Sequence, residues 1–247
     1  LRVQEEVCPA YADHNFHRVY SSVHNFCSVD MGAFYLDVLK DRLYTTPADS
    51  RARRSAQTAM HQVLEALVRW LAPIVSYTAD EIWEHMPGER SGTVFEAEWY
   101  DGLFPLSEGS GLARADWDRI QDVRAAVARR LEALRNEGTI GAALDAEVTV
   151  HCEAPLHDSL AGLGDELRFL LLTSAATLAG RGEAPADAVE DEADGHALWI
   201  DARRSEHAKC ARCWHRRADV GTHGERPDLC GRCVANVDGD GEAREHA

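Results

Sequence analysis

Apolar residues recur every three or four positions along the first hundred residues, which is the spacing of one face of an α-helix. The clearest such helix is predicted from Ser55 to Leu71, and another from about Met31 to Leu43. Pro73 and Pro87 mark boundaries around a third helical segment, Thr78 to His85. Short connections between these segments predict an antiparallel helical bundle. The apolar stripe of the clearest helix consists of Met60, Val63, Leu64, Leu67, Val68 and Leu71.

The helical pattern stops at a run rich in glycine and serine, and we assign residues 102–113 to a linker. Beyond it, apolar residues from Ile120 to Leu134 form a second helical stripe with arginines along its flanks, a charge pattern typical of a solvated helix face.

Alternating residues then predict two short strands, Ala146 to Cys152 and Ala197 to Ala202, with a helix from Leu160 to Leu171 between them. Residues 183–201 carry seven acidic side chains and no Lys or Arg, so we interpret this segment as an exposed loop leading into the second strand. Together these elements predict a small α+β unit.

The charge balance limits how nucleic acid could be bound. The chain carries 42 acidic and 26 basic residues, a formal net charge of -16, and Lys40 and Lys209 are its only lysines. A general nucleic-acid coat is excluded, because such a surface repels phosphate; any RNA contact must be confined to a defined strip. No stretch is apolar and long enough to cross a membrane and no secretory signal opens the chain, so we expect a cytoplasmic protein with no membrane partner.

Four of the seven cysteines form a C-x2-C-x16-C-x2-C array near the C-terminus: Cys210, Cys213, Cys230 and Cys233. This is the spacing of a four-thiolate zinc site, and disulfides or chance are the weaker alternatives. Four sulfur ligands leave no open coordination position, so one structural Zn2+ is predicted rather than a catalytic one. His207, His215 and His223 could substitute as ligands, but surface histidines are the simpler interpretation.

Positive charge collects around this array, where residues 203–232 contain eight basic and four acidic side chains. Trp214 lies between the first cysteine pair and the Arg216-Arg217 dipeptide, a combination suited to an unpaired RNA base beside its phosphate. The alternative, that the ring of Trp214 caps the small metal core, is equally well supported by the sequence.

Known catalytic patterns are missing from the sequence. No glycine precedes either lysine as a P-loop requires, Gly109 and Gly111 lack the third glycine of a dinucleotide fingerprint, and no nucleophile elbow is found. We therefore expect no catalytic residues and no nucleotide cofactor site in this chain.

Several runs closely resemble the C-terminal part of bacterial isoleucyl-tRNA synthetases. They are Phe26 to Thr45, Trp70 to Trp83, Cys210 to His215 with Cys230 to Asn236, Ile140-Gly141, and the closing Gly239-Asp-Gly-Glu242. The runs occur in the order of the family and cover essentially the whole chain. The His-x-Gly-His and KMSKS signatures of the catalytic domain do not occur, so we expect this chain to be inactive alone and to be a fragment of a longer polypeptide.

The resemblance implies a mainly α fold with three domains. These are a helical anticodon-binding domain (residues 1–101), a small α+β junction domain (114–203) and a zinc finger (204–240). From the sequence of the last residues, we expect a disordered tail (241–247).

The resemblance also implies a monomer that grips the anticodon stem-loop of isoleucine tRNA. The catalytic and editing domains of the same polypeptide would then carry out aminoacylation with ATP and Mg2+. The residues expected to face RNA are Lys40, Arg42, Arg212, Trp214, Arg216 and Arg217. The alternative function is a zinc-stapled protein-interaction module that binds no RNA.

Overall fold

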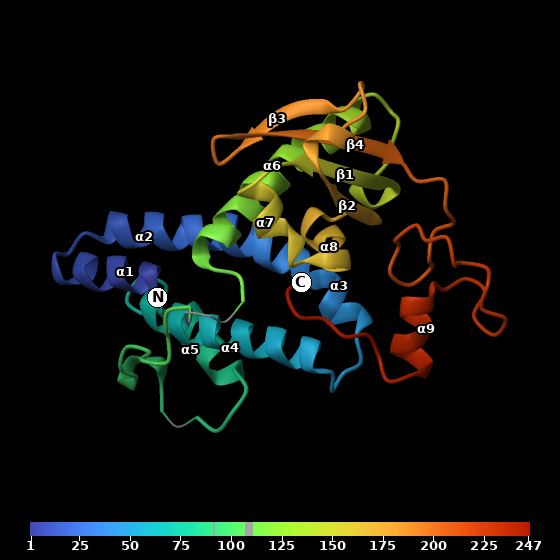
Figure 1. Cartoon of the computed structure of the whole chain (residues 1–247). Coiled ribbons are helices and arrows are strands. Elements are labelled where there is room, and N and C mark those ends of the chain that lie inside the picture. Colours follow the sequence, from blue (N-terminus) through green and yellow to red (C-terminus); the bar gives the residue numbers. More distant parts are fainter. Residues whose placement is uncertain (91, 107–110) are drawn as a thin grey trace. The chain divides into compact units, whose positions relative to one another are not determined.

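The computed structural model describes residues 1–90, 92–106 and 111–247. They form two compact units, which we call the bundle unit (Leu1–Asp37 and Arg53–Pro105) and the sheet unit (Val38–Ala52 and Leu106–Ala247). Figure 1 shows the elements of each unit coloured along the chain. Part of the predicted linker, residues 107–110, lies outside the described residues.

The bundle unit is helical, as the periodicity predicts. Its elements are α1 (Arg2–Ala12), α2 (Phe16–Asn25), a π-helical run η1 (Phe26–Leu36), most of α4 (Arg51–Leu71), α5 (Ser76–His85) and the short η2 (Val94–Glu96). The predicted Ser55 to Leu71 helix is confirmed within α4. The segment predicted as one helix from Met31 to Leu43 differs, because the π-helical run ends at Leu36 and α3 (Asp37–Thr45) follows it.

Two clusters of side chains fill the bundle unit. In the first, Val7 and Val19 are fully buried against Trp70, whose indole N–H donates to the Gln4 amide oxygen at 2.9 Å. In the second, Trp83 lies under the guanidinium groups of Arg69 and Arg90, at 4.8 and 4.5 Å from its ring centroid. Both arginines pair with the buried carboxylate of Glu65, so this buried negative charge is compensated.

The sheet unit is built on four strands, β1 (Ala146–Cys152), β2 (Ala175–Ala179), β3 (Val189–Ala193) and β4 (His196–Arg204). Their order is β2-β1-β4-β3; β1 and β2 are parallel, and the other pairs are antiparallel. The helices α6 (Arg114–Asn136), α7 (Leu156–Ala161) and α8 (Leu167–Leu171) pack with the sheet. The apolar stripe of α6, including Ile120 and Val123, is fully buried.

The acidic segment 183–201 differs from its predicted form as a loop. It contains β3, which turns into β4 through Asp194 and Gly195, both with positive φ. The carboxylate of Asp191 accepts two hydrogen bonds from Arg129 of α6, at 2.7 and 3.1 Å. Arg119 and Arg129, whose segment was predicted to be a solvated face, therefore pair with acidic residues of β3 and its turn.

The helix predicted from Leu160 to Leu171 is also two shorter helices in the structure. α7 ends at Ala161 and α8 begins at Leu167, with Gly162 and Gly164 in the intervening residues. Strand β2, which the sequence pattern does not reveal, follows α8 and completes a parallel crossover from β1.

The C-terminal part of the sheet unit ends in α9 (Gly231–Asp238) and a tail without regular structure. The tail, residues 241–247, is packed rather than disordered, because Arg244 is 8% exposed and Ala247 is 1% exposed. Its last three backbone N–H groups donate to the Glu166 carboxylate at 2.7, 2.8 and 2.7 Å. Among the helices of the described residues, none combines the length and the apolar character needed to cross a membrane.

Candidate metal centre and nucleic-acid interface

The four cysteines of the array come together in the structure. Cys210 and Cys213 lie on a tight turn, closed by a hydrogen bond from the Cys210 N–H to the His215 carbonyl at 2.9 Å and by bridge pairing of Lys209 with Arg216. Cys230 and Cys233 lie at the start of α9. All four Sγ atoms are within 4.8 Å of one another, and all four residues are buried.

The arrangement fits a metal ion better than a disulfide. The Sγ atoms of Cys213 and Cys230 are 3.7 Å apart. A disulfide requires about 2.05 Å, whereas a Zn–S bond of about 2.3 Å places two sulfurs of a tetrahedral site about 3.8 Å apart. The backbone N–H of Cys230 donates to the Cys210 sulfur at 3.3 Å, as expected for a sulfur that carries negative charge.

The electrostatics of the four sulfurs also favour a cation. Hydrogen bonds from Cys213 and Cys233 lower the pKa of the Cys230 thiol, while hydrogen bonding to Cys213 and Cys230 raises the pKa of Cys233. A thiolate at Cys230 is therefore stabilised by its neighbours, whereas a second negative charge at Cys233 is disfavoured. A divalent cation removes that conflict, because it stabilises every sulfur as a thiolate.

The three nearby histidines lie in different surroundings. His215 is buried, with its ring 5.5 Å from that of Phe169, and burial lowers the pKa of its imidazole to about 4. His223 lies 3.6 Å from Asp219, and His207 lies 3.7 Å from Glu147. Among the described residues, the grouping suited to a metal is the four cysteines.

Trp214 projects from the turn that carries the first cysteine pair. It is 61% exposed, and its φ of 68° is unusual for a residue with a large side chain. The Lys209 ammonium lies 5.5 Å from the ring centroid. An exposed ring beside a cation is therefore presented at the edge of the finger, while Leu229, Val220 and Val234 pack with the cysteines inside it.

The arginines predicted to face RNA make contacts within the protein. Arg212 donates to the carbonyls of Thr45 at 2.7 Å and Tyr44 at 3.4 Å. Arg216 pairs with Asp145 at 2.8 Å, and Arg217 donates to the Ser174 carbonyl at 3.3 Å. These three side chains hold the finger against the rest of the sheet unit.

The two residues of α3 that were predicted to face RNA, Lys40 and Arg42, differ in exposure. Arg42 is 7% exposed, so its side chain is not placed for contact with a polyanion, whereas Lys40 is exposed. Tyr44, one helical turn after Lys40, is 77% exposed. The set of RNA-facing candidates expected from sequence did not include Tyr44 or Lys209. The sequence does show the i, i+4 spacing of Tyr44 from Lys40 and the position of Lys209 directly before Cys210.

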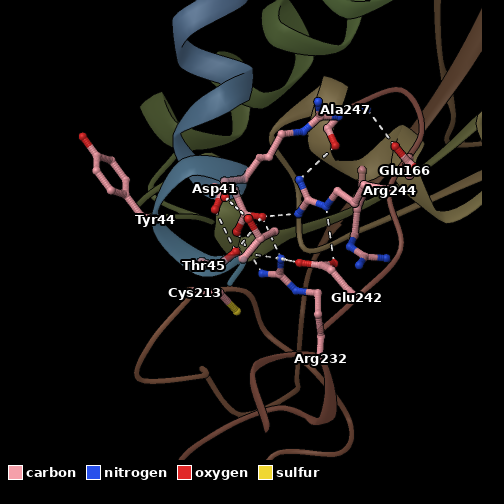
Figure 2. A network of polar contacts seen from close by, with 12 residues as sticks. Asp41, Tyr44, Thr45, Glu166, Cys213, Arg232, Glu242, Arg244 and Ala247 are labelled. Atoms are coloured by element: carbon pink, nitrogen blue, oxygen red, sulfur yellow. Dashed lines mark hydrogen bonds and ion pairs between the residues drawn. The ribbon is translucent and has the colours of Figure 1, made fainter. Parts of the chain in front are cut away.

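A network of charged side chains that the sequence did not reveal connects the finger, α3 and the tail (Figure 2). Asp41 of α3 accepts two hydrogen bonds from Arg232 of α9, at 2.7 and 2.8 Å, and also pairs with Arg244 of the tail. Burial raises the pKa of Asp41, but the hydrogen bond from Arg232 and the charges of Arg232 and Arg244 outweigh it and lower the pKa to about 2.

Comparison with known proteins gives two family matches. Residues 2–150 match the family described as the anticodon-binding domain of tRNA ligase, and residues 209–236 match the zinc finger found in FPG and IleRS. The second match includes all four clustered cysteines.

The chain is also similar to curated isoleucine–tRNA ligases. It is 60% identical over 246 residues to that of Halorhodospira halophila (strain DSM 244 / SL1) and 57% identical over 247 residues to that of Ectopseudomonas mendocina (strain ymp). These alignments cover 99% and 100% of this chain but 26% of each relative, so the chain spans about a quarter of their length. The matches confirm the resemblance inferred from the sequence motifs.

Proposed function

This chain belongs to the family of anticodon-binding domains of tRNA ligases, and we propose that it binds the anticodon stem-loop of isoleucine tRNA as part of a longer isoleucine–tRNA ligase. The proposed tRNA follows the names of the relatives, which are 51 to 60% identical to this chain. Aminoacylation and proofreading would be carried out by parts of the polypeptide outside these residues, with ATP and Mg2+, in the cytoplasm.

The observation that carries the proposal is the exposure of Lys40 and Tyr44 on α3 and of Lys209 and Trp214 on the finger, all in the sheet unit. We call these four side chains the lysine-aromatic surface. Exposed rings can stack on unpaired bases of an RNA loop, and the two ammonium groups can lie beside phosphates. Arg212 donates to the carbonyls of Tyr44 and Thr45, so the end of α3 is held against the finger that carries Lys209 and Trp214.

We assign one Zn2+ to Cys210, Cys213, Cys230 and Cys233. When bound, the ion supplies folding free energy, on the order of 10 kcal/mol for a small finger. The cysteines, together with Leu229 and its apolar neighbours, then hold the loop in the shape that exposes Trp214. Four buried sulfurs leave no position for water or substrate, so the site is structural.

The proposed contacts revise the arginine set expected from sequence. Arg212, Arg216 and Arg217 act chiefly as intramolecular donors, and the buried Arg42 is left out of the RNA-facing set. Lys40 and Trp214 remain in the set, and Tyr44 and Lys209 are added to it. The chain has a net charge of -16, so most of its surface repels phosphate. Binding confined to a small RNA-facing strip would therefore avoid general affinity for nucleic acid.

Binding of two RNAs to the zinc-loaded 247-residue chain tests the proposal. Fluorescence anisotropy would compare isoleucine tRNA with a copy altered only in its anticodon, at the same salt concentration. The proposal predicts tighter binding of the unaltered tRNA and loss of that preference in Trp214→Ala. Equal, weak binding of both RNAs would reject it.

A protein-interaction module is the second candidate, because the bundle unit exposes an aromatic surface among acidic residues. Tyr77 is 94% exposed, Phe95 55% and Trp99 44%. Residues 76–85 and 94–101, which carry these rings, contain six acidic residues and no Lys or Arg. Such a surface repels phosphate and suits a basic, apolar protein segment. Equal, weak retention of the two RNAs favours this candidate.

A further inference from the structure

The C-terminal part of the chain closes around the last turn of α3. Four charged side chains, Asp41, Arg232, Glu242 and Arg244, form what we call the arginine clamp (Figure 2). Arg232 donates to Asp41 in a bidentate arrangement and lies 3.0 Å from Glu242, while Arg244 pairs with both carboxylates. The four residues come from α3, α9 and the tail, which are far apart in sequence.

The clamp is buried, which distinguishes it from ordinary surface ion pairs. The side chains of Arg232 and Arg244 are 11% and 1% exposed, and those of Asp41 and Glu242 are 17% and 13% exposed. The Arg244 guanidinium also lies 3.4 Å from the centroid of the Phe169 ring. Removing one partner from such a group leaves an uncompensated buried charge, so the arrangement resists partial disruption.

Side chains of the finger also bind the backbone of the same helical turn. Arg212, between the first two cysteines, donates to the carbonyls of Tyr44 and Thr45, which are among the last carbonyls of α3 and have no partner within the helix. Arg232, directly before Cys233, additionally lies 3.3 Å from the Thr45 hydroxyl. Each cysteine pair is therefore adjacent to an arginine that grips the end of α3.

Lys40 directly precedes the clamped Asp41, and Tyr44 is one of the two residues whose carbonyls Arg212 holds. Lys40 and Tyr44 are one helical turn apart, so their side chains share a face of the helix. Both are exposed. The side chain of Asp41, next to Lys40, points instead toward the other clamp residues, Arg232 and Arg244 (Figure 2).

We infer that the arginine clamp positions the Lys40 and Tyr44 face of α3 for RNA, with Asp41 as a positioning residue that itself touches neither RNA nor metal. The inference rests on the proposed function, since it assumes that the lysine-aromatic surface binds tRNA. It goes beyond that function by making the tail and α9 part of the apparatus that orients α3. Trp214 is carried by the finger loop, so the clamp does not orient its ring as it orients the side chains of Lys40 and Tyr44.

A double-mutant cycle in tRNA binding tests this inference. Lys40→Ala should weaken binding about three- to tenfold in the wild-type background, as expected for loss of one phosphate contact. In the Asp41→Asn background the same substitution should cost less than about twofold, because the lysine is no longer held in place. Trp214→Ala should cost the same factor in both backgrounds. Equal Lys40→Ala factors in the two backgrounds would overturn the inference.

Two controls separate this role from general damage. Asp49→Asn removes the same charge from an exposed position near the end of α3 and should leave the Lys40→Ala factor unchanged. Zinc content, measured with a chromogenic chelator, should stay at one ion per chain in Asp41→Asn. If both the Lys40→Ala and the Trp214→Ala factors vanish in that background, Asp41 has only a general structural role and the inference fails.

A milder variant keeps the test decisive if Asp41→Asn does not fold. Glu242→Gln retains the bidentate pair of Asp41 with Arg232 and removes one clamp charge. It should reduce the Lys40→Ala factor partially and leave the Trp214→Ala factor unchanged; an unreduced Lys40→Ala factor contradicts the inference. If Lys40→Ala and Trp214→Ala have no effect even in the wild-type background, the proposed function itself fails.

Discussion

Replacement of Trp214 by glycine and by alanine should separate the role of its backbone from that of its ring. Trp214 has a φ of 68°, in the left-handed region, where a residue with a Cβ atom is strained by roughly 1 to 2 kcal/mol. Glycine removes this strain, whereas alanine keeps it. Both substitutions remove the same exposed ring, which lies 5.5 Å from the Lys209 ammonium.

The expected difference in stability follows from two opposing effects. Relief of strain favours glycine, while the greater freedom of glycine in the unfolded chain opposes it by about 0.4 to 1 kcal/mol. The finger of Trp214→Gly should therefore be about 0.5 to 1 kcal/mol more stable than that of Trp214→Ala. Because folding of the finger and binding of metal are coupled, this corresponds to about two- to fivefold tighter zinc binding.

Two assays on the same variants complete the test. Competition with a chromogenic chelator measures zinc affinity, and anisotropy measures affinity for isoleucine tRNA. Both variants should lose about 1 to 3 kcal/mol of tRNA binding, because both lack the stacking ring. Zinc binding by Trp214→Ala that equals or exceeds that of Trp214→Gly would refute the strain assigned to this backbone. A smaller loss of tRNA binding in one variant than in the other would refute the assignment of that loss to the ring.

Three further outcomes are expected. The pKa of Asp41 is lowered to about 2, so its ionised form stabilises the fold by about 2 kcal/mol above about pH 4, and this stability is lost as the pH falls toward 2. The difference in free energy of unfolding between the wild type and Asp41→Asn should therefore shrink over this range. A constant difference would contradict this expectation. Chelation of zinc should increase hydrogen exchange across residues 210–238 while leaving β1 protected, and unchanged exchange in the finger would contradict the structural role of the metal. Gly195→Ala should destabilise the β3-β4 hairpin by about 1 kcal/mol, because Gly195 has a φ of 72°; chemical denaturation would reveal this, and a more stable variant would refute it.

The zinc array and the long helices were predictable because their determinants are local. Two Cys-x-x-Cys pairs define a metal site by spacing alone, and the repeat of apolar residues in α4 depends only on helix geometry. The sheet was half missed for the opposite reason. Strand β3 is acidic and is stabilised by distant partners such as Arg129, although the Asp194-Gly195 dipeptide was a visible hairpin turn.

The functional surface was harder to predict than the metal site. A guanidinium group serves equally well for holding a carbonyl or carboxylate and for binding phosphate, so sequence alone could not separate these roles for Arg212 and Arg216. The structure places both in contacts within the sheet unit. The packed tail was missed because its order depends on Asp41 and Glu166, which lie about 200 and 80 residues away in sequence.

Zinc in the finger and binding of tRNA should be linked, because the folded finger carries Lys209 and Trp214. Affinity of the full chain for isoleucine tRNA should be measured in the zinc-loaded form, after removal of zinc by a chelator, and after zinc is restored. Binding and discrimination against the anticodon-altered copy should be lost with the ion and recovered when it returns. Equal affinity in all three states would contradict it.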